Sequence, residues 1–317
     1  MKILSYTFCF LSCAILFFCL GCSPKPSEEP VRQQETGETT SLPNVPADKE
    51  AVIESGIPEP PLEETTSAVL ARPNPKFAAD ASNSVQLPKV SDLVPQVEAY
   101  VTRLEKSLDD LDGTPRFVED AEVLYRDANT LALIALALGL SKEDNPYKKA
   151  APAIIQATAK METVKNFDEA AKVIAEIRLS LKAEGDPATL SWDKKVVTLR
   201  PIMKAVPNIN TLVKRNLRTE AALKRGTRIV AEGSAVMAVI GQGSIPNVAE
   251  TIKPGADKEW TAHSLEFRDV SLALNKAASE YEAGRDTFDA VQNAYEALSD
   301  SCDSCHKLFY HGEVPKE

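Results

Sequence analysis

Apolar residues recur at spacings of three and four along most of the chain after Pro88, which is the period of helices with one buried face. Glycine and proline are sparse in this part of the chain, so few positions interrupt the pattern. The fifth segment contains Pro201 and Pro207, and proline inside a helix kinks or ends it. The pattern predicts an all-α fold with eight helical segments, over residues 92–111, 117–140, 147–165, 167–184, 192–216, 219–241, 257–283 and 286–310.

The eight segments divide into two sets of four, which suggests an internal duplication. Residues 124–126 (LYR) and 223–225 (LKR) occupy similar positions early in the second segment of each set. Antiparallel helices joined by short connections form four-helix bundles. We therefore predict two tandem antiparallel four-helix bundles, in residues 89–188 and 189–317.

The first 21 residues have the pattern of a signal peptide, with Lys2 followed by a short apolar run. The run ends in Cys19-Leu20-Gly21-Cys22, which resembles the lipobox of bacterial lipoproteins and implies a lipid on Cys22. A plain cleaved signal and an uncleaved anchor are the alternatives, since the run is marginal for spanning a bilayer. In each case the rest of the chain lies outside the cytoplasm. We predict a periplasmic protein that touches the membrane only through an N-terminal lipid anchor.

Residues 22–88 differ in composition from the rest of the chain. Between Ser23 and Pro88 there are 11 of the 21 prolines, with five basic and eleven acidic residues and no sustained apolar period. Such a stretch cannot bury enough apolar surface to fold, and it is predicted to be a disordered tether.

The charge of the chain argues against nucleic-acid binding. Its 36 basic and 46 acidic residues give 36 − 46 = −10. A protein that neutralises phosphates needs the opposite sign. The acidic surface instead favours a basic protein partner.

The clearest chemical motif is Cys302-Asp303-Ser304-Cys305-His306, the C-x-x-C-H attachment signature of c-type haem. Positions i, i+3 and i+4 share one face of a helix, so two thiols reach the haem vinyl groups while the imidazole approaches the iron. Histidine is the usual proximal ligand. The motif predicts one covalent haem c, bound through Cys302 and Cys305, with His306 as an axial iron ligand.

Three other interpretations of the motif remain open. A thioredoxin-type C-x-x-C would stand at the start of a helix after a strand. A zinc site of Cys302, Cys305, His306 and His311 would lack the two separated knuckles of structural zinc. An accidental motif in a structural lipoprotein is the third interpretation.

Residues Thr219 to His311, with C-x-x-C-H near the end of an antiparallel bundle, resemble the cytochrome c prime family. That family carries R-x-x-x-[M/L]-x-x-x-G in its first bundle helix, and Arg225, Ile229 and Gly233 stand in this order here, followed by Met237. After the haem motif the family has an aromatic residue and then Arg. Phe309 matches the aromatic residue, but Tyr310 replaces the Arg.

The resemblance implies a haem pocket that includes Arg225, Ile229, Met237 and Phe309. Ile229 would face the iron from the distal side, and because an alkyl group cannot ligate, it implies five-coordinate iron that is open to NO or CO. Met237 is the alternative sixth ligand if this alignment is shifted. His263 reaches toward a haem from the third segment of the set, although a surface or capping role is expected for it, and His311 is expected to be exposed.

The first set of four segments lacks the haem motif. Leu181, Glu184 and Gly185 stand where the second set has Cys302, Cys305 and His306. Residues 89–188 are therefore predicted to be a degenerate, haemless copy. Members of the cytochrome c prime family commonly pair as homodimers, and a tandem chain is expected to satisfy that interface internally.

The predicted function is one-electron transfer outside the cytoplasm by a haem c protein, with extracytoplasmic redox proteins as partners. The alternative is a five-coordinate haem protein that senses or scavenges NO or CO. Catalytic turnover is not indicated, because the chain has three histidines, no Gly-rich phosphate loop and no HExxH.

Overall fold

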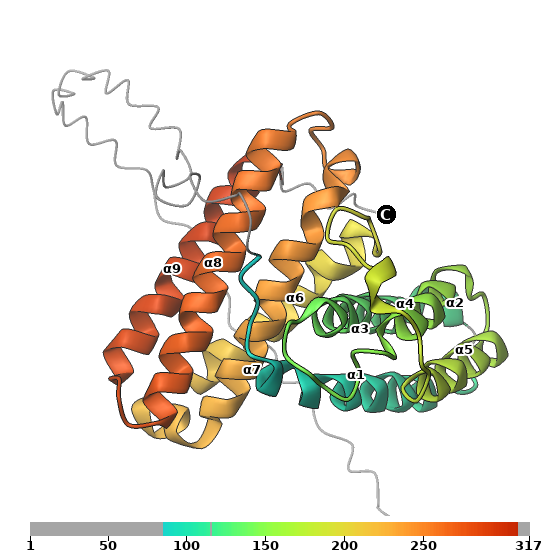
Figure 1. The fold of residues 1–317 in the computed structure, drawn as a ribbon, viewed down its shortest axis with the longest axis horizontal. Coiled ribbons are helices and arrows are strands. Elements are labelled where there is room, and N and C mark those ends of the chain that lie inside the picture. The colour runs from blue at the N-terminus through green and yellow to red at the C-terminus, as the bar shows by residue number, and fades with distance from the viewer. Residues whose placement is uncertain (1–84, 115, 310–317) are drawn as a thin grey trace, which may run out of the picture. The chain divides into compact units, whose positions relative to one another are not determined.

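The computed structural model describes residues 85–114 and 116–309. Cys22, the signal segment, most of the predicted tether, Tyr310 and His311 lie outside these ranges, and so the predictions for them stay predictions. The described residues form an all-α fold, as predicted (Figure 1). Its α-helices are α1 (Val90–Asp110), α2 (Phe117–Asp120), α3 (Glu122–Leu140), α4 (Ala151–Ala159), α5 (Phe167–Ser180), α6 (Leu199–Asn216), α7 (Glu220–Ser244), α8 (Asp257–Glu282) and α9 (Phe288–Phe309).

Four of the predicted segments differ clearly from the helices observed, and one of them is segment 167–184, whose helix α5 ends four residues early, at Ser180. Segment 117–140 divides at Ala121 into α2 and α3. Segment 147–165 becomes helical only at Ala151 and ends in a 3-10 turn, Lys160–Thr163. Segment 192–216 is helical only from Leu199, because Pro201 has no amide proton and fits best in a first turn, where none is needed. Pro207 lies inside α6.

Side-chain caps fix the beginning of two helices. The Asn166 side chain accepts a hydrogen bond from the Glu169 amide at the start of α5 (3.0 Å). The Thr219 hydroxyl accepts one from the Ala222 amide at the start of α7 (3.1 Å). Each bond satisfies an amide that has no partner within its helix, a contribution of about 1 kcal/mol.

The helices pack mainly against their neighbours in the chain. Among the early helices, α3 packs on α1 and α4, and α5 contacts both α4 and α1. Among the later ones, α7 packs on α6 and α8, and α8 packs on α9. The two groups also meet, since α3 contacts α6 and α7, and α1 contacts α7. One apolar core therefore runs through residues of both predicted halves.

The segments Phe117–Leu140 and Glu220–Glu250 are long and apolar enough to cross a membrane. Both form the interior of the fold, with 72% of each apolar stretch buried against other helices. An apolar surface on all sides is what a central helix needs in order to contact several neighbours. Their composition is accounted for by the core.

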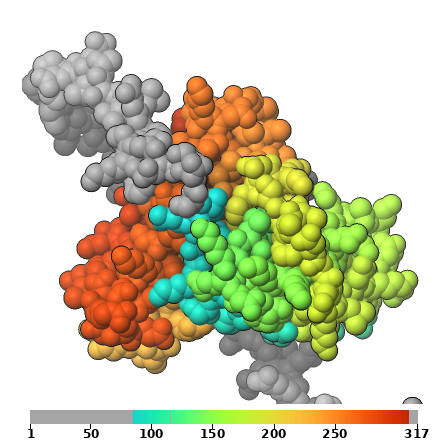
Figure 2. All heavy atoms as spheres, viewed as in Figure 1, coloured from blue at the N-terminus to red at the C-terminus, as the bar shows by residue number. Residues whose placement is uncertain are grey.

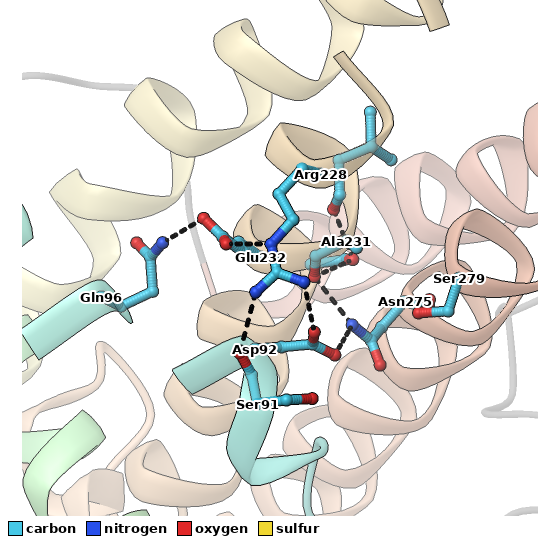
Figure 3. A network of polar contacts seen from close by, with 10 residues as sticks. Ser91, Asp92, Gln96, Arg228, Ala231, Glu232, Asn275 and Ser279 are labelled. Atoms are coloured by element: carbon cyan, nitrogen blue, oxygen red, sulfur yellow. Dashed lines mark hydrogen bonds and ion pairs between the residues drawn. The ribbon is translucent and has the colours of Figure 1, made fainter. Parts of the chain in front are cut away.

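A polar network joins α1 to α7 and α8 (Figure 3). Asp92 is only 4% exposed and accepts a hydrogen bond from the Asn275 amide at 3.0 Å. Arg228 donates to the Ser91 carbonyl at 2.9 Å and to Glu232 at 2.6 Å. The network spans the contact between the early and the late helices, which lie directly against each other in Figure 2.

Candidate functional site

The C-x-x-C-H motif lies in the last turns of α9, the final described helix. Cys302 and Cys305 are half-buried free thiols on the face that packs toward α8, which they share with the buried side chains of Leu298 and Phe309. His306, the next position, is exposed. The helical period places both thiols on one face, one turn apart, as the sequence predicted.

Both thiols are held in the neutral form. Burial raises the pKa of Cys302 to about 11, with a further contribution from the nearby Asp303. Burial likewise raises the pKa of Cys305 to about 12, with Cys302 and Glu266 adding to the shift. A redox C-x-x-C needs the opposite shift, and it obtains it at a helix N-terminus. The position of this motif near the C-terminal end of α9 therefore argues against the thioredoxin-type interpretation.

His263 belongs to α8, and its ring packs against Phe309 of α9. Its environment corrects the expectation of a surface histidine. The side chain is buried, with 2% exposed, and neither ring nitrogen has a hydrogen-bond partner. Its Nδ1 atom is 3.5 Å from Oε2 of Glu266, which is too long for a hydrogen bond, and that oxygen is also buried without a partner. Burial lowers the pKa of His263 and raises the pKa of Glu266.

Aromatic rings pack against this histidine. The ring of Phe309 meets the His263 ring edge-on, with centroids 6.1 Å apart, and meets the Trp260 ring edge-on at 5.1 Å. Trp260 is fixed in turn by a hydrogen bond from its Nε1 to the Ser244 carbonyl at 2.9 Å. The predicted pocket residue Phe309 is therefore buried beside the motif, as part of an aromatic wall.

The contacts between α7 and α8 show which residues of α7 lie at the same position along the helix axes as the thiols. Phe309 of α9 packs on His263 of α8, and the α8 residues that follow approach Gly241 of α7: a Cβ added to Gly241 would lie 2.8 Å from the Arg268 amide and 3.0 Å from the Ser264 carbonyl. Gly241 thus marks the level of the motif along the helices. Ile229 is twelve residues away, or about 18 Å at 1.5 Å per residue, and Met237 is four residues away, or about 6 Å.

The placement of Ile229 argues against its predicted role at the distal side of the iron. Its side chain is 42% exposed, whereas the next residue, Val230, is fully buried. Arg225 is also exposed and lies one turn further from the motif. Met237 is fully buried and remains near the level of the thiols. Along α7, Ile229 and Arg225 are therefore further than Met237 from the level of the motif, and the pocket roles that the resemblance implies for them stay predictions.

The donor set near the motif suits a haem. Helix α9 supplies the thiols of Cys302 and Cys305 and the imidazole of His306, and α8, which packs against α9, carries the buried imidazole of His263 with no hydrogen-bond partner. Sequence reasoning missed Glu266 and Trp260, whose only signal was a spacing of three residues to either side of His263. Within the described ranges no three His, Cys, Asp or Glu side chains are arranged to hold a metal ion by themselves. His311 lies outside those ranges, so the zinc interpretation stays untested.

The corresponding part of the early helices has a different local structure. Helix α5 ends at Ser180, so that Leu181, Glu184 and Gly185 follow it in a turn and the segment after it. The Gly185 amide donates a hydrogen bond to the Lys149 carbonyl at 2.8 Å. These residues offer no thiol or imidazole.

Residues 85–114 and 116–309 form an all-α fold whose last described helix carries a C-x-x-C-H sequence. Comparisons with protein-family models, with curated protein sequences and with solved structures find no match.

Proposed function

We propose that this chain is a c-type cytochrome with one covalent haem, acting in one-electron transfer outside the cytoplasm. The observation that carries the proposal is the pair of thiols of Cys302 and Cys305, one turn apart on one face of α9 and followed directly by His306. The neighbouring helix α8 also buries the imidazole of His263, which has no hydrogen-bond partner. If the C-x-x-C-H sequence were accidental, nothing would explain why the neighbouring helix α8 buries His263 without a hydrogen-bond partner.

The proposed attachment balances with groups that the chain supplies. Each S–H of Cys302 and Cys305 would add across a vinyl double bond of the haem, with a new carbon–sulfur bond, the proton on the neighbouring carbon, and no electrons gained or lost. His306 would supply a nitrogen to the iron. When bound, the haem iron contributes reversible change between the ferric and ferrous states. Trp260 and Phe309 exclude water from one side of the site.

The competing proposal, an open iron site for NO or CO, rested on an alkyl side chain at the distal position. The exposure of Ile229 and its distance from the level of the motif remove that support. Electron transfer therefore leads, with extracytoplasmic redox proteins as partners. If the absorption spectrum of the ferrous protein shifts on addition of CO, the iron has an open position, and gas binding becomes the favoured function.

The test is maturation of the full chain in a host that attaches c-type haem. We expect the denatured protein to retain one haem per chain, by mass and by haem stain, and the double variant Cys302→Ala/Cys305→Ala to retain none. The control Ser304→Ala alters a position between the two cysteines and should load normally. A colourless wild-type protein, or a haem that denaturation releases, would refute the proposal and favour a structural role without haem.

Two further parts of the proposal concern organisation. Helices α1, α3, α4 and α5 contact one another, and each helix from α6 to α9 packs against the next. These contacts support tandem bundles in residues 89–188 and 189–317, of which the first is a haemless scaffold. The contacts of α3 and α1 with α6 and α7 support an internal interface in place of a homodimer, so we expect a monomer in sedimentation.

A lipid on Cys22 would hold the protein at the membrane through a tether. The variant Cys22→Ala should then move the protein from the membrane fraction to the soluble periplasmic fraction. Retention of the variant in the membrane fraction would instead favour an uncleaved anchor.

A further inference from the structure

The buried imidazole of His263 has no hydrogen-bond partner, and this lowers the free energy of unfolding unless a partner is supplied. His263 has both ring nitrogens buried and unpaired, next to an unpaired carboxylate oxygen of Glu266. Each buried polar atom left without a hydrogen bond costs about 1–3 kcal/mol. Apolar residues of similar size would avoid this cost. Something outside the described protein atoms is therefore expected to meet these groups.

The location of His263 indicates what that partner is. His263 and Glu266 lie one turn apart on α8, the helix that packs against α9. Phe309, four residues after Cys305 on α9, packs edge-on against the His263 ring. The imidazole therefore packs against α9 at Phe309, one turn after Cys305 of the attachment motif. A flat apolar macrocycle joined to that turn would be next to His263.

The arrangement of the two α8 side chains is the one that iron-ligating histidines use. Such a histidine commonly donates its second ring N–H to a carboxylate, which fixes the ring and leaves the first nitrogen for the metal. Here Nδ1 lies 3.5 Å from Oε2 of Glu266, and a small shift of either side chain closes the hydrogen bond. Nε2 is then left for the iron.

We infer that His263 is the second axial ligand of the haem iron, opposite His306, and that Glu266 positions its ring. This inference rests on the proposed haem attachment. Iron with two histidine ligands is six-coordinate and low-spin, with no open position for CO. Met237 is the competing ligand, but its thioether is an apolar group in an apolar core and needs no partner, whereas the His263 nitrogens do.

The experiment compares absorption and electron paramagnetic resonance spectra of the matured full chain with those of single variants. The wild type is expected to be low-spin in both oxidation states and unmoved by CO. His263→Leu keeps the volume of the side chain but removes both nitrogens, and it is expected to give a high-spin protein that binds CO. His263→Ala leaves space for added imidazole, which should restore the low-spin spectrum. Met237→Leu and His311→Ala are the matched controls, and both should stay low-spin.

Three results would overturn the inference: a high-spin wild type, a low-spin spectrum retained in His263→Leu, or conversion to high spin in Met237→Leu. Helical circular dichroism of each variant identifies those that fail to fold. Covalent haem in the denatured protein is measured on the same samples. Its absence refutes the proposed attachment, whereas covalent haem with spectra indifferent to His263 refutes only the ligand assignment.

The role of Glu266 is tested by Glu266→Gln, which keeps the shape of the side chain. Because the amide is a weaker acceptor than the carboxylate, the reduction potential should rise while the low-spin spectrum is retained. An unchanged potential would show that Glu266 does not act through the histidine.

Discussion

Replacing Asp92 by alanine tests the network that joins the early helices to the late ones (Figure 3). The carboxylate of Asp92 accepts a hydrogen bond from Nδ2 of Asn275 at 3.0 Å, in a site where the aspartate is only 4% exposed. A hydrogen bond to a charged group contributes about 1.5–3 kcal/mol. The ion pair with Arg228 is longer, at 3.8 Å, and the arginine is half exposed, so it adds less than about 1 kcal/mol.

The rest of the network survives this substitution. Arg228 keeps its bonds to the Ser91 carbonyl and to Glu232, and Asn275 keeps its bond to the Ala231 carbonyl at 2.8 Å. The expected loss in the free energy of unfolding for Asp92→Ala is therefore about 2–3 kcal/mol, dominated by the one charge-assisted bond.

Urea unfolding followed by circular dichroism measures this loss. Gln96→Ala is the matched control on the same helix: its bond to Glu232 (2.6 Å) is only partly buried, so its loss should cost about 1 kcal/mol or less. The double variant Asp92→Ala/Asn275→Ala should show a coupling energy of about 1 kcal/mol or more. A loss below about 0.5 kcal/mol for Asp92→Ala, or additive single effects, would refute the reasoning.

Two further predictions concern the core. Burial raises the pKa of Tyr100 to about 12 from 10.0, so this group costs stability as the pH rises from about 10 to 12, by about 3 kcal/mol for two pKa units. In unfolding measured against pH, Tyr100→Phe should reduce the loss by about that amount, while Cys302 and Cys305, whose pKa values are also raised, keep the remainder. Gly241→Ala should destabilise by about 1–3 kcal/mol, since its Cβ would meet the backbone of α8. Gly233→Ala, which meets only side-chain ends at 3.0 and 3.3 Å, should cost less in the same assay; equal costs would contradict the close backbone approach.

The helices could be predicted from the sequence because periodicity and capping are local properties. Asn166 and Thr219 stand at helix starts and carry their own capping oxygens, so the beginnings of α5 and α7 needed no tertiary information. The start of α6 was missed by seven residues, because the segment from Trp192 forms turns ahead of Pro201. The shared face of Cys302 and Cys305 was likewise a local consequence of helical spacing.

The position of one helix along another could not be predicted in this way. Ile229 has the spacing of a pocket residue within α7, but whether it faces the motif depends on how far α7 and α9 are offset along their axes. That offset is fixed by close contacts such as Gly241 against α8, which pair residues far apart in the sequence. The burial of His263 depends on the same contacts. A lone histidine on a helix is more often a surface residue, and only the packing of Trp260 and Phe309 around it identifies it as a candidate ligand.

The packing of α7 predicts that residues 189–317 do not form a stable domain alone. Every residue from Ser234 to Ser244 is buried, and on one side the neighbours are α3 and α1. The backbone of Gly243 lies so close to Leu133 of α3 that an added Cβ would clash with it. Exposing one large aliphatic side chain costs about 1.5–3 kcal/mol, and a whole domain is stable by only about 5–15 kcal/mol. Removing α3 exposes several such side chains at once.

The fragment should therefore lack a cooperative urea transition and bind hydrophobic dyes, whereas a fragment of residues 85–317 should unfold cooperatively. This outcome would assign the haemless helices a physical function: they cover the apolar side of α7, which in turn fixes the height of α8 and with it the position of His263. A cooperative transition in the short fragment would show that the two halves are independent domains, and the early helices would then need a different explanation, such as a partner surface.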